Sequence, residues 1–229
     1  MLYIGSCRYM YSHKWSYFPA RLHSTKEIIF FLEHIDNIQN IIHTIPSDLI
    51  NKIFGDILHP DVINDTKHFV QHFDKNKSKL ILEICSRKVF YFGNIPLNHY
   101  YTDIRLIHKY KLVEHTISDS EIESDIDDIM HLSKKIFNER IEIHIIPHLN
   151  LRTTKTNDYI PARNELVTLL EYLGEKKTIS IHNIGKYLEN NMNDDVFLEE
   201  YMKDSTHYSK GNEIIAQFLS GRIYASGEE

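Results

Sequence analysis

The chain has 229 residues, of which 42% are apolar and 25% are charged, and its formal net charge is −6. This length and composition exclude disorder of the whole chain and favour a single α/β domain over residues 1–229. The acidic balance argues against nucleic acid and anionic membranes as partners, because both require clustered positive charge.

Cysteine usage and the opening segment indicate the compartment. Cys7 and Cys85 are too few for a disulfide framework and fit a reducing environment. The Met1–Ile4 run is too short for the apolar region of a signal peptide. No apolar run approaches the roughly 18 residues of a membrane span. We therefore expect a cytoplasmic protein.

The first predicted elements are a strand and a long helix. Leu2–Ile4 is an apolar run ended by Gly5, which indicates a buried strand followed by a turn. A capping box from Ser24 to Glu27 opens a helix predicted over about 25–42. Residues 46–75 are expected to form one or two further helices.

A second buried strand is predicted at residues 80–85, where Glu83 is the only charged side chain. Residues 88–92 either extend this strand or form a hairpin partner for it. Residues 95–117 are rich in Tyr and His and lack a regular pattern, so we interpret them as a lid or an insertion.

The remaining elements continue the alternation. Another capping box, from Ser118 to Glu121, begins a helix to about 137. A third strand is predicted at 141–147, a helix from Pro161 to about Leu173, a short strand at 178–181, and a C-terminal helix capped by Ser209. Strands alternating with helices predict a mainly parallel sheet covered on both faces, a three-layer α/β/α sandwich.

Ligands of open α/β sheets bind beyond the carboxyl ends of the strands. Gly5-Ser6-Cys7 ends the first predicted strand, Cys85-Ser86-Arg87 ends the second, and His148-Leu149-Asn150 follows the third. The fold prediction therefore brings these three segments to one rim.

Asp204 stands three residues before His207, at the entrance to the predicted last helix. This spacing lets one turn present a histidine that acts as general base and acid, together with a carboxylate that orients it. The structural alternative is a helix-entry turn with local hydrogen bonds only.

The segments Met1–Met10 and Asp204–Leu219 resemble the SGNH/GDSL hydrolase superfamily, which begins with a strand and a Gly-Asp-Ser turn and ends with Asp-x-x-His before the last helix. The resemblance implies an SGNH/flavodoxin-like fold. Aligning Gly5 with the family glycine places Cys7 at the nucleophile, with Ser6 as second candidate, and G-S-C is similar to carbohydrate-modifying branches. A small buried thiol is the alternative for Cys7.

The oxyanion donors of the family are a glycine after the second strand and an asparagine after the third, and neither is evident here. Ser86 and Arg87 stand where the asparagine-bearing turn is expected and are candidates to replace it. A backbone N–H at the nucleophile turn is a further candidate donor.

Other residues are candidates for substrate binding. Arg21 and His23 are placed to bind an anionic or sugar group near the rim, and Asn150 to orient the substrate. Three arginines are candidates to hold the phosphates of an acyl donor such as acetyl-CoA: Arg87, Arg152 and Arg163. For each arginine the alternative is a surface ion pair.

No metal and no required cofactor are expected. The sequence contains no HExxH, CxxC, Walker loop or G-x-G-x-x-G motif, and no G-x-S-x-G elbow. His144 and His148 would lie about 13 Å apart along a strand, too far to share a metal ion.

The sequence therefore predicts an SGNH-like esterase or O-acyltransferase with a small-molecule or glycan substrate, acting on acetyl groups through a covalent acyl-enzyme. Two alternatives remain. One is a papain-like amide hydrolase that uses Cys7 and His207, and the other is an inactive binding or scaffold protein of the same fold.

Overall fold

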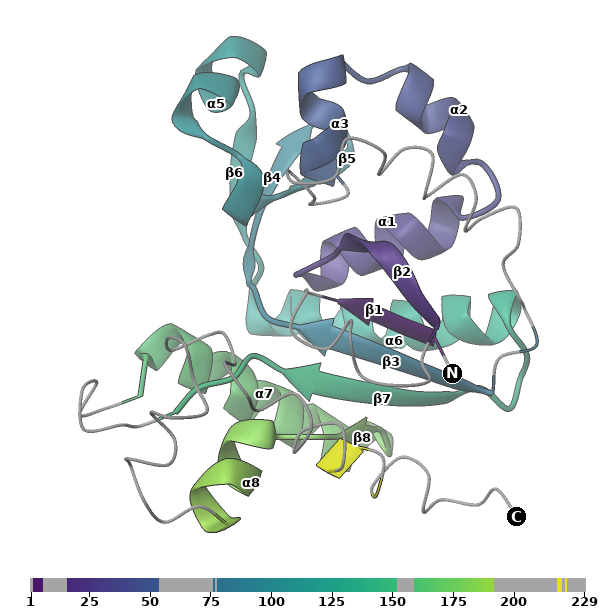
Figure 1. The fold of residues 1–229 in the computed structure, drawn as a ribbon, viewed down its shortest axis with the longest axis vertical. Coiled ribbons are helices and arrows are strands. Elements are labelled where there is room, and N and C mark those ends of the chain that lie inside the picture. The colour runs from purple at the N-terminus through teal and green to yellow at the C-terminus, as the bar shows by residue number, and fades with distance from the viewer. Residues whose placement is uncertain are drawn as a thin grey trace.

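The computed structural model describes residues 2–5, 16–53, 76, 78–151, 159–191, 218–219 and 221 (Figure 1). In these ranges the chain combines helices with a main sheet and a second, smaller sheet. The prediction of an α/β protein with a mainly parallel sheet is confirmed.

The main sheet has five strands in the order β2-β1-β3-β7-β8, and every neighbouring pair is parallel. Its strands are β1 (Leu2–Gly5), β2 (Ser16–Arg21), β3 (Lys79–Ile84), β7 (Glu142–Pro147) and β8 (Ser180–Ile181). The central strands β1 and β3 are buried along their whole length, as their continuous apolar runs predict.

The second sheet is antiparallel, in the order β5-β4-β6, and stands above the carboxyl ends of the main strands (Figure 1). Its strands are β4 (Lys88–Phe92), β5 (Ile95–Asn98) and β6 (Val113–Thr116). The segment interpreted as irregular is thus regular in structure. The missed signal is Gly93-Asn94: Gly93 takes a φ of 59° and closes a two-residue hairpin between β4 and β5.

Seven α-helices and one short 3-10 helix lie in the described ranges. They are α1 (Thr25–His34), α2 (Ile38–His43), α3 (Ser47–Ile53), η1 (His99–Tyr101), α5 (Ile104–Tyr110), α6 (Asp119–Ile136), α7 (Pro161–Lys177) and α8 (Ile184–Asn191). The helix expected over 25–42 is two helices, because Asp36 and Asn37 interrupt it with a turn, as short polar side chains favour. Helix α8 was not predicted.

Alternate residues of the central strands enter two different apolar clusters. Leu2 and Leu80 pack on the face covered by α1, α6 and α7. Tyr3 and Ile81 pack on the opposite face, in a cluster with α8 and Leu219. Figure 1 shows α1 and α6 on one side of the sheet and α8 on the other.

Across the described part of the chain, no helix is both long enough and apolar enough to cross a membrane.

The two capping boxes have the same sequence pattern but differ in burial. We therefore expect them to contribute different amounts to the free energy of unfolding. The Ser24 side chain is buried at the start of α1, and its Oγ donates to Glu27 Oε2 at 2.6 Å. The Ser118 side chain makes the equivalent bond, 2.8 Å to Glu121 Oε2, in an exposed position. We expect Ser24→Ala to lower the free energy of unfolding by about 2 kcal/mol and Ser118→Ala by about 0.5–1 kcal/mol.

Urea unfolding of both variants beside the wild type measures this difference. Equal losses for Ser24→Ala and Ser118→Ala would show that burial of the first box adds nothing to its stabilising effect.

Candidate functional site

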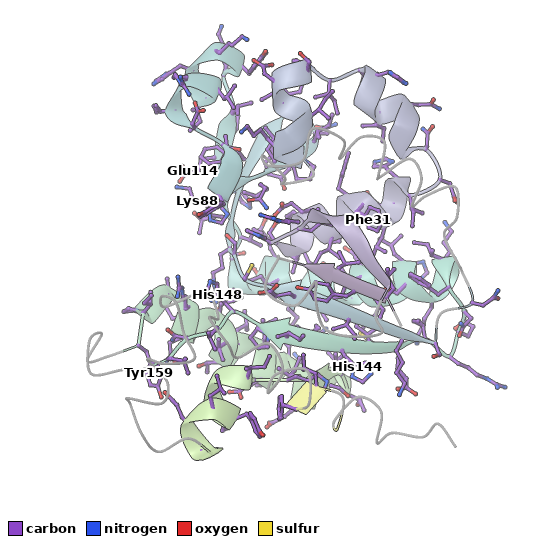
Figure 2. The ribbon with its side chains drawn as sticks, viewed as in Figure 1. Phe31, Lys88, Glu114, His144, His148 and Tyr159 are labelled. Carbon is purple, nitrogen blue, oxygen red and sulfur yellow. The ribbon has the colours of Figure 1, made fainter. Side chains whose placement is uncertain are left out.

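The carboxyl ends of β1, β3 and β7 meet at one edge of the sheet, because the three strands are parallel. Gly5, Cys85 and His148 stand at or just beyond these ends. Figure 2 shows His148 at the end of β7, on the same side of the molecule as Lys88 and Glu114 of the second sheet. Gly5 and the segments that follow β3 and β7 thus share one rim, whereas Ser6 and Cys7 lie outside the described residues.

The strand order of the main sheet singles out one position on this rim as the expected binding site. Numbered along the chain, the main strands run 2-1-3-4-5, so the chain leaves β1 towards one side and β3 towards the other. In doubly wound sheets ligands bind outside the carboxyl ends of the strands at such a switch point. The candidate site is therefore the rim between β1 and β3.

Gly5 ends β1 at this point, and the structure leaves no room for a larger residue. A Cβ atom added to Gly5 would lie 2.5 Å from Glu83 Cβ and 2.5 Å from the Tyr3 hydroxyl oxygen. The Tyr3 side chain thus extends along β1 over Gly5. Glu83 packs against Gly5 from the neighbouring strand β3. A glycine is required here for close packing.

Glu83 is a fully buried carboxylate next to this glycine. Its side chain is 0% exposed, and its Oε2 accepts the Tyr3 hydroxyl at 2.7 Å. The sequence reasoning did not include Glu83 among the candidate site residues. The available signal was a single acidic residue in an otherwise apolar strand, because acidic side chains are rarely buried without a partner.

Hydrogen bonds join the residues that follow β3 to those that follow β2, across the carboxyl end of β1. The backbone N–H groups of Cys85 and Ser86 both donate to the His23 carbonyl, each at 2.9 Å. These two amides are therefore already bonded, although Ser86 is a predicted oxyanion donor. Since Gly5 pairs with Arg21, this bridge passes directly beyond the β1 end.

The Ser86 hydroxyl has a local role as well. Ser86 Oγ accepts the Lys88 N–H at 2.9 Å and lies 3.1 Å from His99 Nδ1. Burial lowers the pKa of His99 below its usual 6.5, and His99 meets His23 edge-to-face with ring centroids 6.2 Å apart. His23, Ser86 and His99 together form a partly buried wall on the side of the rim facing the second sheet.

The other predicted binding residues lie as follows. The Arg87 guanidinium pairs with Asp119 in the first turn of α6, which is the surface ion pair considered above as the alternative. The Arg21 carbonyl accepts Asn98 Nδ2 at 2.9 Å. Arg163 stands in the first turn of α7, where its N–H donates to the Ile160 carbonyl at 3.0 Å.

Asn150 anchors the chain that leads into α7. Its Oδ1 accepts the Ile160 N–H at 3.1 Å, and its Nδ2 donates to the Ile160 carbonyl at 3.4 Å. This amide pair joins the two ends of the 151–159 segment. The described bonds of Asn150 are thus structural, and its predicted role in orienting substrate stays a prediction.

Five predicted residues lie outside the described ranges: Ser6, Cys7, Arg152, Asp204 and His207. The start of the predicted last helix at Ser209 lies outside them too. Two residues near its far end are described. Leu219 is fully buried in the cluster that holds Tyr3 and Ile81, and Phe218 stacks on Tyr187 with centroids 4.0 Å apart.

A buried histidine pair lies elsewhere, at the β7–β8 edge. His144 Nδ1 is 3.0 Å from His182 Nε2, and the rings stack with centroids 5.2 Å apart. Burial lowers the pKa of His144, which favours the neutral form of this imidazole near pH 7. Within the described ranges, no group of three or more His, Cys, Asp or Glu side chains is placed to hold a metal ion.

Comparisons with known proteins add no relative, since no protein-family model, curated protein or solved structure matches this chain.

The electrostatics of the α1 entry next to the rim predict a pH effect on stability. Burial raises the pKa of Glu27 from 4.5 to about 7, against the hydrogen bonds from Ser24 and His23 that lower it. The folded state therefore holds a proton that the unfolded state releases near pH 4.5. The stabilisation is complete below that pH and is lost as the pH rises through about 7.

We expect wild type to lose stability relative to Glu27→Gln between pH 5 and pH 8, by on the order of 2–3 kcal/mol. Glu121→Gln is the matched control, because hydrogen bonds from Ser118 lower the pKa of this capping carboxyl to about 2. Its difference from wild type should stay constant over the same pH range. Urea midpoints at several pH values give both differences, and parallel behaviour of the two variants would contradict the account.

Proposed function

We propose that the protein is an SGNH-like acyl-ester enzyme, an esterase or O-acyltransferase, whose reaction takes place at the β1–β3 rim. One observation carries the proposal. The first strand ends at the switch point in a glycine that the packing requires, and Ser6 and Cys7 follow it directly in the sequence. This is where the resemblance expects a nucleophile, in a three-layer α/β/α sandwich.

The position of Leu219, near the C-terminus, supports the same proposal. Leu219 is buried in one cluster with Tyr3, which lies over Gly5. Leu219, near the far end of the last predicted helix, therefore packs on the face of the sheet that carries Tyr3, and the Asp204–His207 segment comes shortly before that predicted helix in the sequence. A chain arranged in this way favours a shared cleft for the two ends.

The proposed reaction has two steps, and each step transfers the acyl group and moves one proton through His207. His207 accepts the Cys7 proton, the thiolate attacks the acyl carbonyl, and the C–O bond to the leaving alcohol breaks as the alcohol takes the proton from His207. Water or a sugar hydroxyl then attacks the thioester, and its proton passes through His207 to Cys7. Ser6 is the alternative nucleophile, and Asp204 orients His207.

The substrate is proposed from the resemblance alone, as an acetyl ester of a carbohydrate or an acetyl donor with a carbohydrate acceptor. Arg163 and the other candidate arginines would then meet the phosphates of a donor such as acetyl-CoA. Arg87 is the weakest of these candidates, because Asp119 already pairs with it.

A catalytically inactive binding protein is the second candidate, and one observation favours it. The backbone amides of Cys85 and Ser86 are occupied by the His23 carbonyl, so this turn does not offer them to an oxyanion. A papain-like amide hydrolase has less support, because β1 leads to Cys7 as a strand of a parallel sheet.

We expect Cys7→Ala and His207→Ala to reduce turnover of an activated acetyl ester by about 10³-fold or more, because each removes a group that acts directly on the reacting atoms. Cys85→Ala and His131→Ala are the matched controls. Cys85 is the other cysteine and is only partly exposed, and His131 is an exposed histidine on α6. Both controls should keep wild-type rates.

If His207→Ala kept full activity and an unchanged urea midpoint, the acyl-enzyme proposal would be contradicted. Absence of activity in the wild type, together with tight binding of an acetylated sugar, would establish the binding protein instead.

A further inference from the structure

The buried pair of His144 and His182 fastens the edge strand β8 to its neighbour β7. β8 has only two residues, and it pairs with β7 at two positions. Directly after β8, the His182 N–H donates to the Ile145 carbonyl at 2.8 Å, and His182 Nε2 lies 3.0 Å from Nδ1 of His144, which Figure 2 labels on β7. His182 thus extends a very short strand pairing by one backbone bond and one side-chain bond.

The same contact sets the position of α8, which begins two residues after His182. Ile184 and Leu188 of α8 are buried in the apolar cluster that contains Tyr3 and Ile81. If His182 separates from β7, the start of α8 is no longer held, and this face of the main sheet loses part of its cover.

The contact between the two rings has room for a single proton. A neutral imidazole carries one N–H donor and one acceptor nitrogen. The N···N distance and one ring radius at each end account for nearly all of the 5.2 Å between the ring centroids, so the two nitrogens face each other directly. Protonating both of these nitrogens would set two N–H groups and two positive charges against each other. Full protonation of His144 and His182 therefore requires the rings to separate.

The charged groups around the pair do not remove this constraint. Glu142 Oε2 lies 3.6 Å from His144 Nε2, and the Lys79 ammonium lies 3.4 Å from the same carboxylate oxygen. On α8 and α7, Lys186 and Glu171 pair with each other at 3.8 Å. Burial lowers the pKa of His144 from 6.5, and the Glu142 carboxylate raises it by less. His144 thus resists protonation while the pair is closed.

We propose that the His144–His182 contact is an acid-sensitive latch, which holds β8 and α8 on the main sheet at neutral pH and releases them when both imidazoles are protonated. Neither Cys7 nor His207 takes part, so the latch is independent of the proposed reaction. Released histidines take up protons near their usual pKa of about 6.5, whereas the closed pair cannot be fully protonated. The stabilisation is therefore complete above about pH 6.5 and is lost as the pH falls below it.

Amide hydrogen exchange of the full chain, followed by mass spectrometry and corrected for the intrinsic pH dependence of exchange, measures the local opening. We expect the protection of residues 180–191 to fall about tenfold or more between pH 7 and pH 5, relative to α6, because opening takes up an additional proton. Taking the ratio to α6 removes effects on the whole fold, such as that of Glu27, which acts in the opposite direction with pH.

The double variant His144→Asn/His182→Gln replaces both rings by amides that do not titrate. The Asn amide reaches the position of Nδ1 and the Gln amide that of Nε2, so a hydrogen bond between the two side chains is retained. We expect this variant to keep the protection of 180–191 at pH 7 within about threefold of wild type and to lose the acid response. His131→Asn, at an exposed position of α6, is the matched control and should keep the wild-type response.

If the double variant does not fold, His182→Gln alone decides, because it leaves only one titrating ring in the contact. Its acid response should be smaller than that of wild type by about threefold or more. An acid response that persists undiminished in the double variant, or in His182→Gln, overturns the proposal. Wild-type protection that falls equally in 180–191 and in α6 also overturns it, since acid would then unfold the chain as a whole.

Discussion

At the centre of the main sheet, Tyr3 lies over Gly5 and donates its hydroxyl to the buried carboxylate of Glu83. This contact joins β1 to β3 at the point where the chain direction reverses across the sheet. It requires a glycine, because any Cβ would meet Glu83 and Tyr3 at once. It also places a carboxyl group where the hydrophobic effect alone would favour an apolar side chain, and the Tyr3 hydroxyl offsets part of the cost of burying it.

The rest of the molecule is arranged around this contact in two ways. On one face of the sheet, α1, α6 and α7 complete the larger apolar cluster. On the other, α8 and Leu219 cover the face that carries Tyr3. Beyond the strand ends, the His23 carbonyl binds the amides of Cys85 and Ser86, and the second sheet rises from that turn. The rim is thus bounded by the residues that follow β2 and β3 and by the His23–Ser86–His99 wall.

Much of this arrangement could be predicted from local patterns. The buried strands follow from apolar runs, and both capping boxes form as their Ser-x-x-Glu spacing predicts. The second sheet was missed because its strands are short and mixed in polarity, and its hairpin depends on the positive φ of Gly93. Contacts between distant residues gave no local signal: the Tyr3–Glu83 bond spans 80 positions, and the His144–His182 pair spans 38. The contact between the Ser86 hydroxyl and His99, 13 positions away, gave no local signal either, and the role of Ser86 as an oxyanion donor stays a prediction.

The central claim is that Ser6 or Cys7, directly after Gly5 in the sequence, is a nucleophile. Brief exposure of the full chain to an activated acetyl ester, followed by acid quenching and tryptic digestion, tests it directly. The account predicts one acetyl group on the peptide Met1–Arg8, lost in Cys7→Ala if Cys7 is the nucleophile and in Ser6→Ala if Ser6 is. An acetyl group found only on lysines, or no adduct on that peptide, would contradict the account.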